Sequence, residues 1–320
     1  MKAIVTGVTG QDGYYMVQQL LREGFEVLGL TSNLPLAQNH FVSNHTEPLC
    51  LAEFNYMLAG GFSKVVEDYE PNFIFNFAAK ATGQGMFDAP YKINRLNGGF
   101  VIDILEALRQ SRRREEIVFC QSSSSEMYGN VTEMPQSEET PFRPKNPYGA
   151  AKLYAHNMVN IYRANYAVRC CSAILYNHES VRRSTQFVTK KIAIAAALIK
   201  LGRADSVTLG SLDAKRDWGY APEYVDAIFR MARADSVEDY VVATGRLNSV
   251  RDLCEAAFGH LDLSYLDFVQ TRTSELRVAE SFNLCGDTTK IKEKLGWSAK
   301  KTVKEIMIEL VEHEIRRLNG

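Results

Sequence analysis

Residues 117–152 read IVFCQSSSSEMYGNVTEMPQSEETPFRPKNPYGAAK, and this stretch decides the fold that we expect. It starts with an apolar run, which predicts a buried strand, and continues into hydroxyls and one carboxylate. It ends in a predicted helix that carries Tyr148 and Lys152 four residues apart, and therefore on one face. In an open α/β sheet, ligands bind at the carboxyl ends of the strands. We therefore predict one site that contains Ser124, Glu126, Tyr148 and Lys152.

The flanking sequence alternates between apolar strand patterns and helical patterns. The predicted strands cover 2–6, 25–30, 72–77, 117–120, 169–176, 207–210 and 240–243. The predicted helices cover 15–22, 54–69, 93–110, 147–166, 187–201, 249–258 and 303–318, with loops at 34–50 and 211–219. Such alternation implies a parallel sheet with right-handed crossovers. The expected fold class is α/β, a Rossmann-type doubly wound parallel sheet with a smaller C-terminal α/β substrate-binding region.

A glycine-rich loop, GVTGQDG at 7–13, follows the first predicted strand and precedes a helical pattern. Glycines at this spacing permit a tight turn, a close approach of backbone N–H groups to a pyrophosphate, and close helix packing. The context favours a dinucleotide-binding loop over a structural turn. The cofactor residues expected in this loop are Gly7, Thr9, Gly10, Gln11, Asp12 and Gly13.

The end of the second predicted strand bears on which dinucleotide binds. An acid there is typical of NAD enzymes, and a nearby arginine is typical of NADP enzymes. This chain has Thr31, Ser32 and Asn33 instead. Since no acid is present to repel a 2′-phosphate, the residues favour NADP, with NAD as the alternative. Ser32 and Asn33 are the candidate contacts.

Polar side chains also follow the strand predicted at 169–176. His178 by itself is more often a structural histidine than a ligand, but at the carboxyl end of a strand we expect it to line the cleft. Arg216 is a candidate for forked binding of phosphate. The alternative for Arg216 is a surface ion pair with Asp217.

The composition limits the class of protein. The chain has 320 residues and a formal net charge of −1, which gives no electrostatic case for nucleic acid or membrane as a partner. No run approaches the roughly 18 apolar residues that a membrane span needs. The six cysteines lack the spacing of a zinc site, so we expect reduced thiols, no metal and a cytoplasmic location.

The pair Tyr148 and Lys152, after a glycine-rich loop, resembles the extended short-chain dehydrogenase/reductase superfamily. Longer motifs are similar to those of the GDP-mannose 4,6-dehydratase family within it. These motifs are QSSSSEMYG at 121–129, NPYGAAKLYAHN at 146–157, ILYNHESVRR at 174–183 and LGSLDAKRDWG at 209–219. The likeness is continuous from about residue 117 to 260.

The resemblance implies an NADP-dependent lyase that converts GDP-mannose to GDP-4-keto-6-deoxymannose. Hydride leaves C4, water is removed across C5 and C6, and hydride returns to C6. Tyr148 would take the 4-OH proton, with its pKa lowered by Lys152 and the positive nicotinamide, while Ser124 bonds the same oxygen. Glu126 would remove the C5 proton and return it to the leaving 6-OH.

The family also implies binding residues. Further cofactor residues would be Asn55, Tyr56, Ala78, Ala79, Lys80, Lys152, His178 and Arg183. Substrate residues would be Asn177, Glu179, Val188, Lys191, Arg216, Arg277 and Glu280. Residues 1–165, with strands from 166–180 and 238–246, would bind the dinucleotide, and 181–320 would mainly bind the nucleotide sugar.

The chain departs from the family pattern at four places. The arginine-bearing loop that binds the 2′-phosphate and supports tetramers is here Thr31–Leu34 and a shorter loop. An aspartate near the adenine becomes Asn55, and the catalytic threonine becomes Ser124. Ala-Gln-Ser becomes Ala79-Lys80-Ala81, which would bring a cation into the pocket. These changes bear on cofactor preference, assembly and the identity of the sugar.

The resemblance also implies a homodimer through the helices 93–110 and 147–166, the usual dimer seam of the superfamily, with a homotetramer as the second option. Three alternatives to the proposed activity stay open. One is a GDP-sugar 4-reductase or epimerase, and another is a 4,6-dehydratase acting on a different GDP-sugar such as a heptose. The third is a cofactor-binding sensor without catalytic activity. The presence of all four residues Ser124, Glu126, Tyr148 and Lys152 argues against this third alternative.

Overall fold

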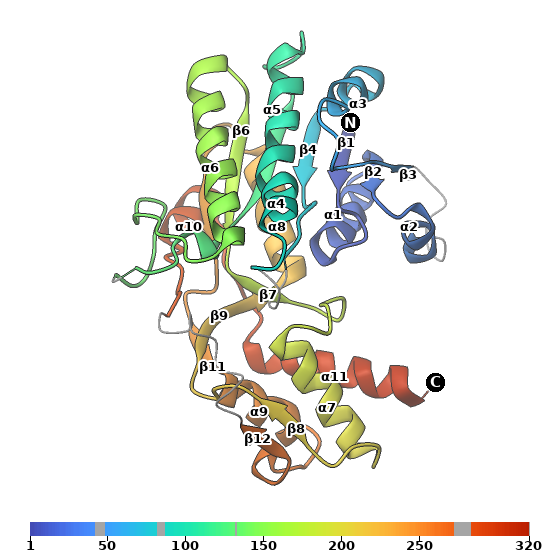
Figure 1. Cartoon of the computed structure of the whole chain (residues 1–320), viewed down its shortest axis with the longest axis vertical. Helices are drawn as coiled ribbons and strands as arrows, with labels where there is room; N and C mark the ends of the chain where they lie inside the picture. The colour runs from blue at the N-terminus through green and yellow to red at the C-terminus, as the bar shows by residue number, and fades with distance from the viewer. Residues whose placement is uncertain (42–48, 82–86, 132, 272–282, 320) are drawn as a thin grey trace.

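The computed structural model describes residues 1–41, 49–81, 87–131, 133–271 and 283–319. Its largest element is a seven-stranded sheet of order β10-β6-β5-β4-β1-β2-β3, in which every neighbouring pair is parallel (Figure 1). The strands are β1 (Lys2–Thr6), β2 (Glu26–Thr31), β3 (Leu49–Glu53), β4 (Phe73–Asn76), β5 (Val118–Ser124), β6 (Cys170–Leu175) and β10 (Tyr240–Val242). The strand order reverses between β1 and β4, which confirms the doubly wound sheet and places its ligand crevice there.

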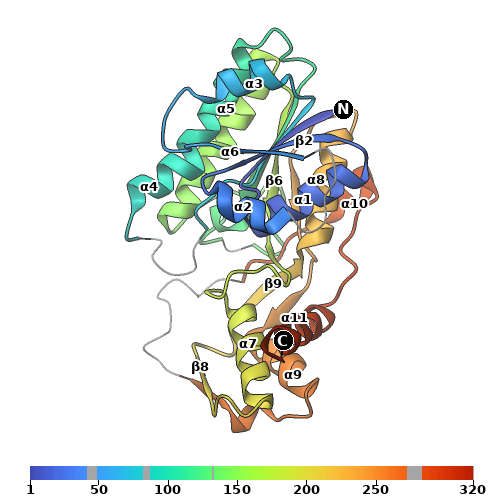
Figure 2. The ribbon, with the colours of Figure 1, turned by 90° about the vertical axis from the view of Figure 1, so that its right-hand side faces the viewer.

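Helices cover both faces of this sheet, which is why its central strands are apolar on both sides. One face carries α1 (Gln11–Arg22), α8 (Ala221–Arg233) and α10 (Thr289–Leu295). The other face carries α3 (Phe62–Tyr69), α5 (Phe100–Gln110) and α6 (Pro147–Tyr166), as Figure 2 shows with the sheet between the two layers. None of the helices in the described ranges is long and apolar enough to cross a membrane.

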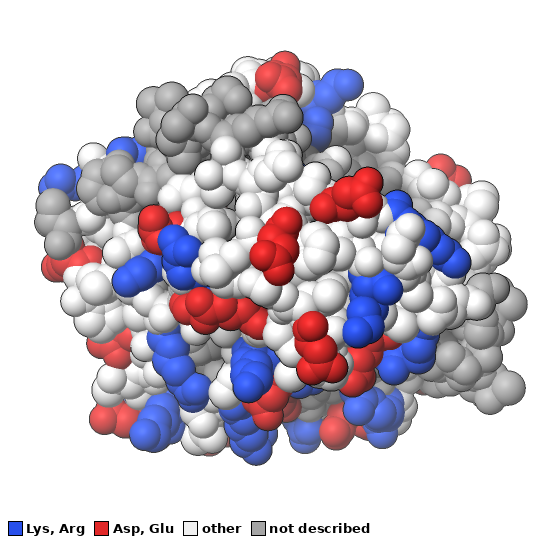
Figure 3. Space-filling view, turned by 90° about the horizontal axis from the view of Figure 1, so that it is seen from below, with Lys and Arg blue, Asp and Glu red and all other residues white. Residues whose placement is uncertain are grey.

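A smaller α/β region lies beyond the carboxyl edge of the large sheet, in the lower half of Figure 1. It contains a sheet of order β11-β9-β7, a second sheet β12-β8, and a third buried apolar cluster. Its elements are β7 (Asn177–Glu179), α7 (Val188–Lys200), β8 (Val207–Leu209), β9 (Lys215–Tyr220), β11 (Leu247–Ser249), α9 (Val250–Gly259), β12 (Val269–Thr271) and α11 (Val303–Asn319). Figure 3 shows basic and acidic side chains mixed over the face seen from below.

The segment 34–50, predicted as a loop, contains α2 (Leu34–Phe41). The helix begins where Asn33 Oδ1 accepts the N–H of Leu36 at 3.0 Å. It ends with Phe41 stacked on Tyr14 of α1, at a ring-centroid distance of 5.2 Å. This helix has only eight residues, too few to be stable alone, so its packing against α1 decides its conformation.

The segment 211–219, also predicted as a loop, contains β9. This strand pairs with β7 on one side and β11 on the other. The carboxylate of Asp217 is buried there and accepts the N–H groups of Thr244 and Gly245, each at 2.9 Å. A polar strand of this kind carries no apolar alternation that the sequence could reveal.

Two helix predictions need correction, and two further helices were not predicted. The helix predicted at 54–69 starts only at Phe62, and the helix at 93–110 is divided into α4 (Pro90–Asn94), a π-helical turn and α5. In the π-turn, the buried Asn97 donates its Nδ2 to the carbonyl oxygen of Ile93 at 2.9 Å, which competes with regular helix bonding. The helices α8 and α10 are not predicted by the sequence patterns.

Candidate active site

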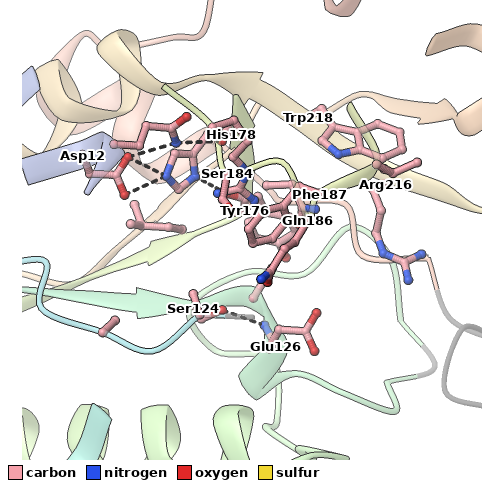
Figure 4. A pocket seen from close by; sticks show the side chains of 18 of the residues that line it. Asp12, Ser124, Glu126, Tyr176, His178, Ser184, Gln186, Phe187, Arg216 and Trp218 are labelled. Atoms are coloured by element: carbon pink, nitrogen blue, oxygen red, sulfur yellow. Dashed lines mark hydrogen bonds and ion pairs between the residues drawn. The ribbon is translucent and has the colours of Figure 1, made fainter. Parts of the chain in front are cut away.

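A cavity of about 810 Å³ opens where the carboxyl edge of the large sheet meets the smaller region (Figure 4). Its wall contains residues of the glycine-rich loop, the four predicted catalytic residues and some of the residues predicted to bind the sugar nucleotide. The predicted residues that line it are Thr9, Gly10, Gln11, Asp12, Gly13, Ala79, Ser124, Glu126, Tyr148, Lys152, Asn177, His178, Arg183, Val188, Lys191 and Arg216.

The end of β5 presents a hydroxyl and a carboxylate to the cavity. Ser124 is the last residue of the strand, and its Oγ accepts the N–H of Glu126 at 3.2 Å, which starts a short 3-10 turn. The turn brings the Glu126 side chain to the cavity, where its Oε2 accepts the Nδ2–H of Asn146 at 2.9 Å. Two candidate catalytic groups therefore stand on one rigid strand end.

The first turns of α6 supply the other two candidate groups. Asn146 caps the helix, because its Oδ1 accepts the N–H of Gly149 at 2.7 Å, and a proline occupies the first helical turn. Tyr148 and Lys152 are buried on the same face, with Lys152 Nζ 5.8 Å from the centre of the Tyr148 ring. The shared face predicted from their spacing is confirmed.

In the protein alone the pKa of Tyr148 is not lowered, whereas the expected lowering concerned Lys152 together with the positive nicotinamide. Burial raises the pKa of Tyr148 to about 12, although the nearby Ser124 hydroxyl opposes the shift. Burial also lowers the pKa of Lys152 to about 8. The Nζ of Lys152 donates to the carbonyl oxygen of Ser122 at 2.7 Å, so its nearest bond is to the backbone of β5. Loss of hydration is therefore the main cause of both pKa shifts.

The glycine-rich loop has the geometry of a pyrophosphate cradle. Gly7 has a left-handed φ of 69°, and a Cβ on Gly13 would lie 2.4 Å from the carbonyl oxygen of Gly7. Gly10 precedes α1 without a side-chain cap and lines the cavity, so N–H groups of the first turn face the space where a dinucleotide would bind. These residues fit such a cofactor.

The side chains of the loop bind β7 and the residue after it. Nε2 of His178 lies 3.0 Å from both carboxylate oxygens of Asp12, and Nδ1 lies 2.6 Å from the carbonyl oxygen of Tyr176 (Figure 4). Gln11 donates to the carbonyl oxygen of His178 at 3.0 Å and accepts the Ser180 hydroxyl at 2.8 Å. A dinucleotide would therefore meet the backbone of this loop more than the side chains of Gln11 and Asp12.

His178 faces acceptors at both ring nitrogens, an arrangement that the cationic ring satisfies with a hydrogen on each nitrogen. Burial opposes this charge, but the Asp12 carboxylate outweighs burial and raises the pKa of His178. In turn, burial favours neutral Asp12, but His178 outweighs it and lowers the pKa of Asp12. The result is an ion pair between the first turn of α1 and β7 of the smaller sheet.

The opposite end of the cavity carries a cation. The side chain of Arg216 extends from β9 on the side of Glu126, away from Asp12 and His178 (Figure 4). It does not pair with Asp217, whose carboxylate is held by backbone N–H groups and the Thr244 hydroxyl. Its Nη1 donates to the carbonyl oxygen of Lys215 at 2.7 Å, which leaves most of the fork for an anion.

A family model described as GDP-mannose 4,6 dehydratase matches residues 4–310. The chain belongs to the GDP-mannose 4,6-dehydratase family. The human GDP-mannose 4,6 dehydratase is 35% identical over 338 residues, an alignment that covers 98% of this chain and 91% of the human protein. As a member of this family, the chain uses a nicotinamide dinucleotide.

Solved structures show the same fold at lower identity. The dTDP-glucose 4,6-dehydratase of Bacillus anthracis, solved with NAD, has a TM-score of 0.84 at 18% identity and covers 100% of this chain and 97% of its own. The RMD protein of Pseudomonas aeruginosa, solved with NADPH, has a TM-score of 0.79 at 21% identity, with 99% of each chain covered. The fold thus occurs with either form of the dinucleotide.

Two residues implied by the dehydratase family resemblance lie away from the cavity lining. Glu179 is buried, accepts the Thr189 hydroxyl at 2.6 Å and pairs with Arg183 Nε at 3.1 Å, so it supports Arg183 from behind. Lys80 is not among the described lining residues, although Ala79 and Ala81 on either side of it are. The cation expected from Lys80 in the pocket is therefore absent from that lining.

Other predicted binding residues form hydrogen bonds with neighbouring protein groups. Asn33 and Asn55 use their side-chain oxygens for local N–H groups, at 3.0 Å from the nitrogens of Leu36 and Met57. Tyr56 accepts the N–H of Gly7 at 3.2 Å and so supports the glycine-rich loop. The predicted residues outside the described lining are Gly7, Ser32, Asn33, Asn55, Tyr56, Ala78, Lys80 and Glu179. Arg277 and Glu280 lie outside the described residues.

Several lining residues were not singled out by the sequence patterns. They are Phe77, Ala81, Ser122, Ser123, Ser125, Leu175, Tyr176, Arg182, Ser184, Gln186, Phe187, Leu209, Gly210, Ser211, Ala214, Trp218 and Val250. Most are apolar or small and come from strand ends or the loop before α7. Arg182 could have been predicted as a lining residue, because it directly precedes Arg183 in the polar segment that follows a predicted strand.

Proposed function

We propose that this member of the family is a hydro-lyase that converts GDP-mannose to GDP-4-keto-6-deoxymannose. The observation that carries the proposal is the convergence of Ser124, Glu126, Tyr148 and Lys152 on one cavity that also contains the pyrophosphate cradle. A single set of these groups suffices for oxidation at C4 and for elimination across C5 and C6. The family supplies the substrate class.

In the oxidation step, Tyr148 takes the proton of the sugar 4-OH, and Ser124 donates to the same oxygen. Lys152, bonded to the backbone of β5, places its positive charge close to the tyrosine ring. When bound, the nicotinamide dinucleotide accepts the hydride from C4 and later gives it to C6. The positive charge that arrives with the oxidised form favours the ionised Tyr148.

In the elimination step, the 4-ketone acidifies the C5 proton. Glu126 takes this proton, and the C6–O bond breaks as Glu126 returns a proton to the leaving hydroxyl, so that water departs. The C5–C6 double bond then accepts the hydride at C6, and C5 takes the proton held by Tyr148. The net change is the loss of one water, with no net redox change.

Mass spectrometry of the protein with GDP-mannose and oxidised cofactor tests this function. We expect the sugar nucleotide to lose the mass of one water, without stoichiometric use of reduced cofactor. Unchanged GDP-mannose, together with water loss from another GDP-sugar such as a heptose, would transfer the proposal to that sugar. Stoichiometric oxidation of NADPH with a 4-keto sugar would instead identify a 4-reductase.

We further propose NADP as the cofactor. Thr31, which ends β2, is buried, and no acid follows it before α2. Arg182 lines the cavity with its guanidinium 3.7 Å from the centre of the Tyr14 ring in the first turn of α1. It has no carboxylate partner in the described part of the chain, so it is available to a 2′-phosphate.

The change Arg182→Gln should therefore raise the Kd for NADPH by roughly 10- to 100-fold and leave that for NADH within about threefold. Fluorescence titration of both reduced cofactors measures this selectivity. Arg216→Gln is the matched control, since it removes a cation from the opposite end of the same cavity. Tighter binding of NADH than of NADPH by the unaltered protein would contradict the proposal. Glu53, the exposed acid that ends β3, would then be the candidate contact for the ribose of NAD.

We also propose a homodimer that buries the outer faces of α4 and α6. Large apolar side chains are exposed there, with 79% of Tyr91, 46% of Tyr154 and 45% of Ile161 accessible. The double change Tyr154→Glu and Ile161→Glu should convert the dimer to a monomer in analytical ultracentrifugation, with unchanged circular dichroism. A wild-type sedimentation coefficient in that variant would place the interface elsewhere.

A further inference from the structure

Asn146 connects the two halves of the candidate active site. Its Oδ1 accepts the N–H of Gly149 at 2.7 Å and thereby caps α6, the helix that carries Tyr148 and Lys152. Its Nδ2 donates at the same time to Glu126 Oε2 at 2.9 Å. One amide therefore holds both the start of the helix and the carboxylate that follows β5.

The backbone brings these two segments close independently of Asn146. A Cβ on Gly149 would lie 2.5 Å from the carbonyl oxygen of Glu126, so only glycine permits this approach of the helix to the turn. The position of the Glu126 main chain is thus set by packing against α6. The orientation of its carboxylate depends on the hydrogen bond from Asn146.

The chemistry of the amide suits both contacts at once. Asparagine, aspartate and serine cap helices about equally well, because each offers an oxygen to the first-turn N–H groups. Aspartate cannot donate while it is ionised, and it would place a like charge beside Glu126. Serine has a shorter reach and a single proton. Asparagine alone of the three offers an acceptor to the helix and a separate N–H donor to a carboxylate.

We infer that Asn146 is a positioning residue that orients Glu126 and donates a hydrogen bond to its carboxylate for proton abstraction from C5. The inference rests on the role proposed above for Glu126. It assigns to one side chain a function in catalysis beyond the capping of a helix. It also explains how Glu126 and Tyr148 keep a constant relative position. Asn146 bonds to the Glu126 carboxylate and caps the helix that carries Tyr148.

The substitution Asn146→Asp tests this role, because it keeps the cap, removes the donor and adds a like charge. We expect the acid limb of the pH–rate profile for GDP-mannose dehydration to move upward by roughly one pH unit. At a pH below that limb the rate should fall roughly tenfold, because a one-unit shift changes the ionised fraction by that factor. The midpoint of urea unfolding should stay at the wild-type value.

Asn146→Ser is the matched control that keeps the cap without the added charge. Its acid limb should move less than that of Asn146→Asp, again at the wild-type urea midpoint. Identical acid limbs in the wild type and both variants would overturn the inference and leave Asn146 as a helix cap only.

A measurement without substrate separates this inference from the proposed function. Infrared difference spectra between each protein and its Glu126→Gln counterpart report the pH at which the Glu126 carboxylate takes up a proton. That pH should be higher in Asn146→Asp than in the unaltered protein, even if GDP-mannose is not the substrate. An unchanged protonation pH overturns the inference whatever sugar is turned over.

Discussion

Glu126→Gln should lower the rate of dehydration by roughly 10²–10⁴-fold while the cofactor binds as tightly as in the wild type. Glutamine has nearly the same shape but can neither take the C5 proton nor protonate the leaving 6-OH. The hydrogen bonds of the glycine-rich loop do not involve this side chain, so the dinucleotide site should remain intact. Single-turnover mass spectrometry and a cofactor titration measure the two effects.

The blocked step can be identified directly in this variant. Because oxidation at C4 precedes elimination, Glu126→Gln should accumulate reduced nicotinamide, visible by its absorbance, in a single turnover. Glu139→Gln, an exposed glutamate in the loop that follows, is the matched control and should turn over normally. Wild-type dehydration by Glu126→Gln would remove Glu126 from the mechanism.

Tyr148→Phe should also lose roughly 10²–10⁴-fold, but at the earlier step. The hydroxyl that accepts the 4-OH proton is missing, so hydride transfer from C4 has no base. Burial raises the pKa of Tyr148 to about 12 in the protein alone, so the ionised form must be favoured by the ligands as they bind. In single-turnover absorbance, no reduced nicotinamide should appear.

Comparison of the two variants gives each residue its own signature. Glu126→Gln accumulates reduced nicotinamide, whereas Tyr148→Phe does not. Tyr154→Phe, an exposed tyrosine on the same helix, controls for the loss of a hydroxyl and should behave as the wild type. Rapid formation of reduced nicotinamide by Tyr148→Phe would show that another group takes the 4-OH proton.

The sequence predicted how the candidate catalytic residues are arranged because local rules determine their positions. A strand that ends in hydroxyls, and a helix with residues at i and i+4, have periodicities that place Ser124, Tyr148 and Lys152 without knowledge of the remainder. The glycine-rich loop is local in the same sense. Its tight turn follows from the glycine spacing at 7–13.

The directions in which the predicted binding side chains face depend on contacts between distant segments of the chain. His178 and Asp12 form an ion pair across 166 positions of the chain, so each is occupied by the other. Glu179 is turned toward Arg183 and Thr189 behind the cavity wall. No local pattern indicates whether such polar residues face a ligand or each other, because that is decided by which strands become neighbours.

By itself, the sequence determined the doubly wound sheet, the glycine-rich loop and the set Ser124, Glu126, Tyr148 and Lys152, since periodicity and turn chemistry act over a few residues. Only the tertiary structure decided that α2 and β9 form where loops are predicted, because their partners lie far away in the chain. It also decided the electrostatics. Burial, which no single segment reveals, raises the pKa of Tyr148 and lowers that of Lys152.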